Sequence, residues 1–372
     1  SVKLGQRDYG TAQTVLGNVI TLNVIIGIAF SIITLMFLNP ILYFFGASAD
    51  TIGYARDYME IILLGNVVTH MYLGLNAVIR AAGHPQKAMY ATINTVIINT
   101  ILDPIFIFVL DMGVRGAALA TMISQLVSVV IELVIFLNPK EVIYFHRGIW
   151  RLKRDITMRA LGIGTAPFLM HMASCFVVIV LNNQLKRYGG DMAIATYGIT
   201  NRFMFFFAMV VMGLNQGMQP IVGYNYGAKL FDRMVRALKL TAMCATCVMG
   251  VLWLFGLVWP EGFIRLFTHD ELLIAQSVAP ARVMLCTMVM VGFPMVVGNF
   301  YTSIGLSGKA IFLSLTRQVI FLIPCILLLP LLFQTLNFTP IWGVWWSLPL
   351  CDALSAVLAA IILNRDMKKF RV

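Results

Sequence analysis

The chain has 372 residues, of which 60% are hydrophobic and only 12% charged, and its formal net charge is +11. Soluble domains carry about 25% charged residues, so this composition excludes an ordinary water-soluble globular protein. The six cysteines fall in apolar stretches, and we interpret them as small buried residues rather than as metal or redox centres.

Uncharged apolar stretches recur along the whole chain, and a membrane-spanning helix needs roughly 20 such residues. Strands of a membrane barrel would alternate polar and apolar residues, which these stretches do not, so they predict helices. We therefore expect an all-α polytopic membrane protein with ten spans. In chain order they cover residues 13–38, 56–82, 88–110, 115–137, 160–185, 192–215, 237–259, 275–304, 310–333 and 340–363.

The positive charges are distributed unevenly between the two ends of these spans. With alternating spans, twenty of the 27 lysines and arginines fall on one side, in segments 3–7, 80–87, 140–159, 229–239, 309–317 and 365–371. The opposite side holds five: Arg56, Arg115, Lys186, Arg187 and Arg265. Basic loops face the cytoplasm, so we expect a multi-pass protein of the inner membrane with a cytoplasmic C-terminus. The charge thus orients the chain in the lipid bilayer, and we expect no nucleic-acid partner.

The two halves of the chain are related by an internal repeat. A shift of 222 residues places "LGQRDY" (4–9) on "YGAKLF" (226–231) and "GHPQKA" (83–88) on "GLSGKA" (305–310). One shift holds over about a hundred residues without a gap. Two like halves joined by a basic linker are the usual plan of a secondary transporter, with binding sites between or within the halves.

The repeat predicts two pseudo-repeated helical lobes. Residues 1–137 form the remainder of an N-terminal lobe with four helices, and 138–159 a basic cytoplasmic linker. Residues 160–364 form a C-terminal lobe of six helices, followed by a basic cytoplasmic tail, 365–372. The counterparts of spans 160–185 and 192–215 would precede Ser1, so we expect an intact protein of six plus six helices. A native ten-span protein is the alternative.

A polar stripe with an acid runs through the span 88–110. Its members recur at spacings of three and four residues, on one helix face: Thr92, Thr95, Asn99 and Asp103. An acid inside the membrane is costly unless it is paired or hydrated, and it therefore indicates a functional site. Pro104 has no amide proton, which frees the carbonyl of Thr100 to accept another bond or a cation.

The next span carries a matching stripe, formed by Thr121, Ser124, Gln125, Ser128 and Glu132. Two such helices are expected to face each other or a water-filled cavity, because lipid would penalise both stripes. Carboxylate, amide and hydroxyl oxygens suit a hard cation such as sodium, and a buried acid equally suits a proton. The alternative is that Asp103 is a structural acid that only joins the helices by hydrogen bonds.

Three motifs resemble the multidrug and toxic compound extrusion family, in its prokaryotic branches: "QPIVGYNYGA" (219–228), "IRAAGHPQKA" (79–88) and "INTILDPIFIF" (98–108). The resemblance covers nearly the whole chain. It implies twelve helices in two lobes and efflux of small organic, often cationic, compounds by alternating access. It also implies antiport against sodium or protons, with no cofactor and no catalytic residues. We expect a monomer.

The resemblance also assigns residues. Family members from archaea and bacteria bind a cation with an Asn and an Asp four residues apart and a Thr on the next helix, which match Asn99, Asp103 and Thr121 here. A fourth ligand, an Asp on helix one, has no counterpart in this chain. No metal beyond a sodium ion at Asp103 is expected.

The second half has no copy of this site, because the shift of 222 places Phe321 and Cys325 on Asn99 and Asp103. A shift of 227 places Asp352 on Gln125 and Ser355 on Ser128. Asp352 is thus either an acid that faces the substrate cavity or a partner in an interhelical hydrogen bond.

We expect the substrate cavity to be lined by Gln125, Asp352, Ser355, Met209 and Phe206. The methionine and the aromatic ring suit a pocket for aromatic cations, and ordinary packing is their alternative role. A second function keeps the fold but moves lipid-linked or amphipathic anions, as flippases of the same superfamily do. A membrane-embedded enzyme would need a catalytic constellation, and the sequence contains none that we recognise.

Overall fold

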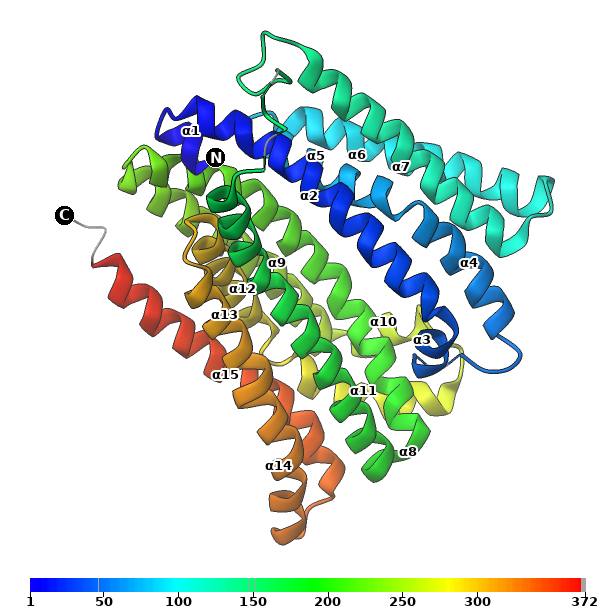
Figure 1. Ribbon diagram of the computed structural model, residues 1–372. Coiled ribbons are helices and arrows are strands. Elements are labelled where there is room, and N and C mark those ends of the chain that lie inside the picture. The colour runs from blue at the N-terminus through cyan, green and yellow to red at the C-terminus, as the bar shows by residue number, and fades with distance from the viewer. Residues whose placement is uncertain (46, 147, 151, 369–372) are drawn as a thin grey trace. The chain divides into compact units, whose positions relative to one another are not determined.

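The computed structural model describes residues 1–372 except 46, 147, 151 and 369–372 (Figure 1). Four basic residues that we placed on the cytoplasmic side, Arg147, Arg151, Lys369 and Arg371, therefore lie outside the described residues. Every regular element in the described ranges is helical, which confirms the predicted fold class.

The chain divides into two compact units, Ser1–Arg159 and Ala160–Val372, and the division falls at the end of the basic segment 138–159. The first unit contains α1 (Val2–Gly5), α2 (Tyr9–Met36), α3 (Leu38–Phe44), α4 (Ile52–Leu64), α5 (Asn66–Ala81), α6 (Pro85–Pro104), the π-helix η1 (Ile105–Val109) and α7 (Gly113–Leu137).

The second unit begins within α8 (Arg154–Gly227), the longest helix of the chain. It continues with α9 (Phe231–Val258), α10 (Pro260–Arg265), α11 (Glu271–Leu285), α12 (Met288–Ser303), α13 (Ser307–Leu315), the π-helix η2 (Thr316–Leu322), α14 (Ile323–Thr335) and α15 (Pro340–Met367).

All ten predicted spans have helical counterparts. Within the described residues, seven helical stretches are long and apolar enough to cross a membrane, or nine when the bent pairs α4–α5 and α11–α12 each count as one span. One of these stretches, α8, covers two predicted spans, 160–185 and 192–215. It breaks between them at Gly190, whose φ of 66° lies in the left-handed region that favours glycine.

The helix boundaries reproduce the internal repeat. The helices α2 and α9 both have 28 residues, and the shift of 222 relates their first and last residues. The same shift relates both ends of α5 and α12, and each follows a bend, of 55° after α4 and 47° after α11. Because α4–α5 and α11–α12 bend at equivalent positions, the two units share one fold and not only a sequence pattern.

The turns repeat as well. Arg7 and Lys229 both have a φ of 59°, and Gly83 and Gly305 have φ values of 95° and 79°. Each glycine ends one helix and allows the chain to turn into the next within a few residues. Residues other than glycine rarely adopt a positive φ, because their Cβ then approaches the following carbonyl oxygen.

A repeated lysine ties together the ends of each unit. In the first unit Lys87, at the start of α6, binds Glu141 in the segment after α7. In the second unit Lys309, at the start of α13, binds Asp366 near the end of α15. The shift of 222 relates the two lysines, so each unit joins the start of an equivalent helix to a residue at or shortly after the end of its last helix.

Replacing the glycine of the second turn tests the requirement for a left-handed backbone. At Gly305 a Cβ would meet nothing within 4 Å, so Gly305→Ala creates no steric clash. It lowers the free energy of unfolding only because alanine disfavours the left-handed backbone, by about 1–2 kcal/mol. We expect a lower melting temperature in detergent. Gly308→Ala is the control: it also meets nothing within 4 Å and lies in α13, where alanine favours the helix. Equal melting temperatures for the two variants would contradict this assignment.

The Glu141 cluster makes stability depend on pH. The hydrogen bond from Lys87 and the nearby His84, whose Nε2 lies 2.7 Å from the carboxylate, hold the pKa of Glu141 below its ordinary value of 4.5. A depressed carboxylate pKa stabilises the fold above the unfolded value, and this contribution is lost as the pH falls through the folded value. Glu141→Gln should therefore melt below the wild type at neutral pH, and the difference should shrink below pH 4.5. The control is Asp50→Asn, which changes an exposed side chain and should melt together with the wild type at neutral pH.

Candidate functional site

The three residues predicted to bind a cation lie together on α6 and α7, which pack side by side. Asn99 and Asp103 are one turn apart on α6, and the Asn99 amide Nδ2 donates to Asp103 Oδ1 at 3.2 Å. The same nitrogen lies 3.5 Å from Thr121 Oγ1 on α7. All three side chains are half-buried, so the group is neither sealed in the core nor fully exposed.

The group presents oxygen atoms with unused lone pairs. The Thr121 hydroxyl donates to the carbonyl of Ala117 at 3.0 Å, which leaves its oxygen to accept. Within the described part of the chain, no hydrogen bond occupies the side-chain carbonyl of Asn99. A carboxylate, an amide and a hydroxyl oxygen are ligands for a hard cation, and the carboxylate can also take a proton. The described residues contain no group of three or more His, Cys, Asp or Glu side chains able to hold a metal ion, so this set stands apart from a transition-metal centre.

The helix backbone is irregular immediately after the acid. The α-helical pattern of α6 ends at Pro104, and the π-helix η1 follows directly. Pro104 cannot donate a hydrogen bond to the carbonyl of Thr100, while the Thr100 hydroxyl donates to the carbonyl of Val96 at 2.8 Å. Short π-helical segments within α-helices often occur at functional sites.

The two polar stripes face each other over several turns. The hydroxyl groups of Thr95 on α6 and Ser128 on α7 hydrogen-bond to one another. Gln125, which we expected to line the substrate cavity, accepts a hydrogen bond from Thr69 of α5 at 2.6 Å. The stripes thus join three helices of the first unit.

A second acid of the first unit lies in a buried cluster. Glu132 is fully buried, and its Oε1 accepts a hydrogen bond of 3.0 Å from Asn76 Nδ2 on α5. Arg80, one turn further along α5, donates to Asn76 Oδ1 at 2.7 Å. Glu132 Oε2 has no hydrogen-bond partner among the described residues. Sequence reasoning placed Glu132 on the stripe but missed its partner Asn76 and the arginine bound to that amide. Their signal was the spacing of four residues between Asn76 and Arg80 on a neighbouring span.

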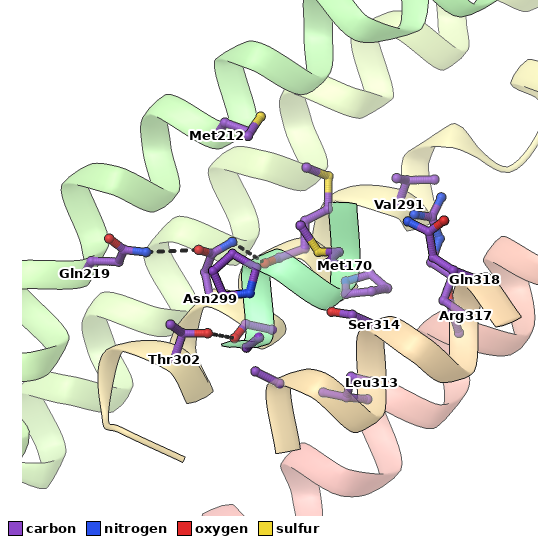
Figure 2. Close-up of a pocket in the computed structure, with 17 residues that line it drawn as sticks. Met170, Met212, Gln219, Val291, Asn299, Thr302, Leu313, Ser314, Arg317 and Gln318 are labelled. Atoms are coloured by element: carbon purple, nitrogen blue, oxygen red, sulfur yellow. Dashed lines mark hydrogen bonds between the residues drawn. The ribbon is translucent and has the colours of Figure 1, made fainter. Parts of the chain in front are cut away.

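The second unit contains a cavity of about 270 Å³ within its own helices. Its walls come from α8, α12, α13, η2 and α15, and the predicted residue Ser355 is among them. Figure 2 shows Gln219 and Asn299 on one side of the cavity, joined by a hydrogen bond of 3.0 Å, and Arg317 with Gln318 on the other.

The predicted acid of the second unit is paired with an arginine. Arg317 of η2 donates from Nε and Nη2 to Asp352 Oδ1 of α15, at 3.0 and 2.7 Å. Arg317 lines the cavity, whereas Asp352 lies behind it and is 4% exposed. Of the two roles that the sequence left open for Asp352, the geometry corresponds to the interhelical hydrogen bond.

The two residues of α8 that we expected to line the substrate cavity lie outside this cavity, whereas two other methionines of α8 line it. Met209 and Phe206 are exposed on α8, at 55% and 66%, and are not among the residues that line the cavity. Met170 and Met212, from the same helix, do line it (Figure 2).

Two repeated helical units with polar groups inside their spans define a multi-span membrane transporter. The MatE family model matches residues 1–105 and 158–327. The chain belongs to the MatE family. Over 360 residues it is 27% identical to the multidrug export protein MepA of Staphylococcus aureus strain N315, covering 97% of this chain and 78% of that protein. The MepA protein of Staphylococcus haemolyticus has the same identity and coverage.

Solved structures of transporters resemble this chain as well. A structure of the MATE multidrug transporter DinF-BH in complex with a ligand is 35% identical and has a TM-score of 0.89, covering this chain completely and 82% of that chain. An outward-facing multidrug resistance MATE family transporter of the MOP superfamily is 20% identical, covers all of this chain and 82% of its own, and has a TM-score of 0.92; it supports the fold alone.

Removing Asn76 tests the buried cluster. Asn76→Ala leaves Glu132 without its amide donor and Arg80 without its acceptor, at a cost of about 1–3 kcal/mol for the unpaired buried groups. We expect a lower melting temperature in detergent. Asn94→Ala is the matched control, because Asn94 is exposed on α6, and such a change alters stability by about 0.5 kcal/mol or less. Equal melting temperatures for Asn76→Ala and Asn94→Ala would show that the hydrogen bonds of Asn76 have no structural role.

Proposed function

We propose that this protein exports small organic compounds, often cationic ones, in exchange for sodium ions or protons. The observation that carries the proposal is that the Asn99 amide lies within hydrogen-bond distance of both Asp103 and Thr121, inside a membrane-spanning helix pair. Asp103 is a negative charge without a basic side chain in ion-pair contact among the described residues. Such a site favours binding of a cation, because lipid and protein offer the carboxylate little other stabilisation.

Ion binding drives transport only if the site binds the ion with different affinity in two conformations. The irregular backbone at Pro104 and η1 supports such a difference, because a disturbed helix can change its course next to the acid. In this proposal, sodium or a proton at Asp103 favours the conformation that releases the organic substrate. The cycle then continues by alternating access.

The relatives support the substrate class. MepA is named a multidrug export protein, and the DinF-BH structure is that of a multidrug transporter in complex with a ligand. We extend export of several organic compounds to this chain. The uneven distribution of lysine and arginine supports an orientation in the inner membrane with basic loops in the cytoplasm. We further propose a monomer without cofactor, enzymatic activity or nucleic-acid partner.

The flippase alternative finds less support. A carrier of amphipathic anions needs uncompensated positive charge in its cavity, and Arg317 is already paired with Asp352. Export coupled to a cation therefore remains the function that we propose.

Asp103→Asn tests the coupling site, because it removes the charge and keeps the size of the side chain. Full-length protein in liposomes should export tetraphenylphosphonium under a sodium gradient at equal pH, or under a pH gradient without sodium. The variant should lose gradient-driven export about tenfold, within the usual range of coupling energies. The gradient that drives the wild type identifies the ion.

The control is Asp111→Asn, in the exposed turn after η1. Asp111 has a φ of 50°, and asparagine tolerates this conformation as aspartate does. This variant should transport as the wild type does. Unchanged export by Asp103→Asn under both gradients would remove Asp103 from the mechanism.

A further inference from the structure

The cavity of the second unit is a separate site with its own chemistry, because all its lining residues lie between Ala166 and Ser355. Its volume of about 270 Å³ is close to the lower end of the range of small-molecule sites, about 300–1,000 Å³. The predicted cation ligands Asn99, Asp103 and Thr121 do not line this cavity. Whatever binds there is recognised by the second unit's own side chains.

Arg317 gives the cavity hydrogen-bond donors that are not used. A guanidinium has five N–H groups, and Asp352 accepts from two of them, at Nε and Nη2. No side chain or backbone group in the described part of the chain accepts from the other three. The Arg317 side chain is 33% exposed, so these donors can reach a ligand in the cavity that it lines.

The charge of the cavity wall is already balanced. Among the described residues that line the cavity, Arg317 alone is charged, and the Asp352 carboxylate behind it, with its side chain 5% exposed, compensates it. A cationic ligand would find no counter-charge there, and an anionic ligand would leave one negative charge in excess. An uncompensated charge inside a membrane-spanning helix bundle costs several kcal/mol, so the cavity favours an uncharged ligand.

The remaining wall supplies an apolar surface and partnered amides. Met170, Met212 and Met295 line the cavity, and their flexible, polarisable side chains adapt to ring systems. The amide groups of Gln219 and Gln318 also line it, and each donates to a protein partner, Asn299 Oδ1 in the first case and Ser174 Oγ in the second. Arg317, with three free N–H groups, therefore offers more free donors than any other described residue of the wall.

The backbone presents Arg317 and Gln318 in an unusual way. Both residues belong to the π-helix η2, which interrupts the path from α13 to α14. A π-helical turn changes the direction of the side chains within it relative to the flanking α-helix, and such turns are frequent at functional sites. The register thus brings two polar side chains of one turn into the same cavity (Figure 2).

We propose that this cavity binds an uncharged organic molecule that bears a carbonyl group. Its carbonyl oxygen accepts a hydrogen bond from Arg317, and its apolar body lies against the three methionines. The site stands independently of ion coupling at Asp103. The two units then differ in ligand chemistry, with a cation in the first and a neutral hydrogen-bond acceptor in the second.

Benzophenone is a suitable probe, because it is an uncharged diaryl ketone that also labels its neighbours. Under near-ultraviolet light its excited carbonyl takes a hydrogen atom from a nearby C–H bond, and the two carbon radicals join, so the adduct keeps the mass of the whole probe. Purified full-length protein in detergent is irradiated with it, and adducts are mapped by peptide mass spectrometry. We expect labelling at Met170, Met212 or Met295, above that at the exposed Met209 outside the cavity.

The double variant Arg317→Gln, Asp352→Asn replaces the charged guanidinium by a shorter, neutral amide without leaving a buried charge. At probe concentrations below saturation it should reduce labelling of the three cavity methionines about tenfold, the effect of losing one hydrogen bond to a charged donor. Labelling of Met209 should stay unchanged. A second variant, Ser314→Phe, keeps the ion pair and fills the cavity, and it should also suppress the label if the double variant fails to fold.

Competition distinguishes the ligand classes. Excess tetraphenylphosphonium should leave the cavity label in place, and Asp103→Asn should not alter it. Displacement of the label by the cation would overturn the proposal for a neutral site. Equal labelling of cavity methionines and Met209, unaffected by the double variant and by Ser314→Phe, would show that the cavity binds nothing. Neither result bears on transport by Asp103→Asn, so the two proposals fail separately.

Discussion

Lipid offers no hydrogen bonds, and this constraint governs both the fold and the polar groups within it. The backbone meets it by forming helices throughout the spans. The side chains meet it in pairs: Thr95 with Ser128, Asn76 with Glu132, and Arg317 with Asp352. Each pair joins two different helices, so the groups that lipid would penalise most become the links that fix how helices pack.

The repeated units use equivalent positions for different chemistry. The shift of 222 relates Thr95 to Arg317, and the shift of 227 relates Ser128 to Ser355, next to Asp352 by one turn. Thr95, one member of a neutral hydroxyl pair in the first unit, thus corresponds to the arginine of an ion pair in the second. Conversely, Asp103 corresponds to Cys325, so the second unit has no acid at the position equivalent to Asp103. The repeated fold thus holds two different electrostatic environments.

The sequence predicted those features that depend on local pattern. The ten spans follow from the apolar stretches, and the approach of Asn99 to Asp103 follows from their spacing of four residues on one helix. The bond between Arg317 and Asp352 joins residues 35 positions apart, and that from Asn76 to Glu132 joins residues 56 apart. Such contacts depend on helix rotation and packing, which apolar periodicity does not specify. The π-helix η2 adds a further change of register that no composition signal indicates.

Each unit contains a π-helix next to a polar side chain of its candidate site. Pro104 directly precedes η1 and Pro324 follows η2 by two residues, and each proline removes one backbone donor from the helix. Yet the shift of 222 would place Ile105, where η1 begins, at Leu327, beyond the end of η2. The irregularities are therefore not copies of one inherited feature. Each lies near its own proline, beside Asp103 in one unit and around Arg317 in the other, so an irregular backbone accompanies the polar side chain of the candidate site in both.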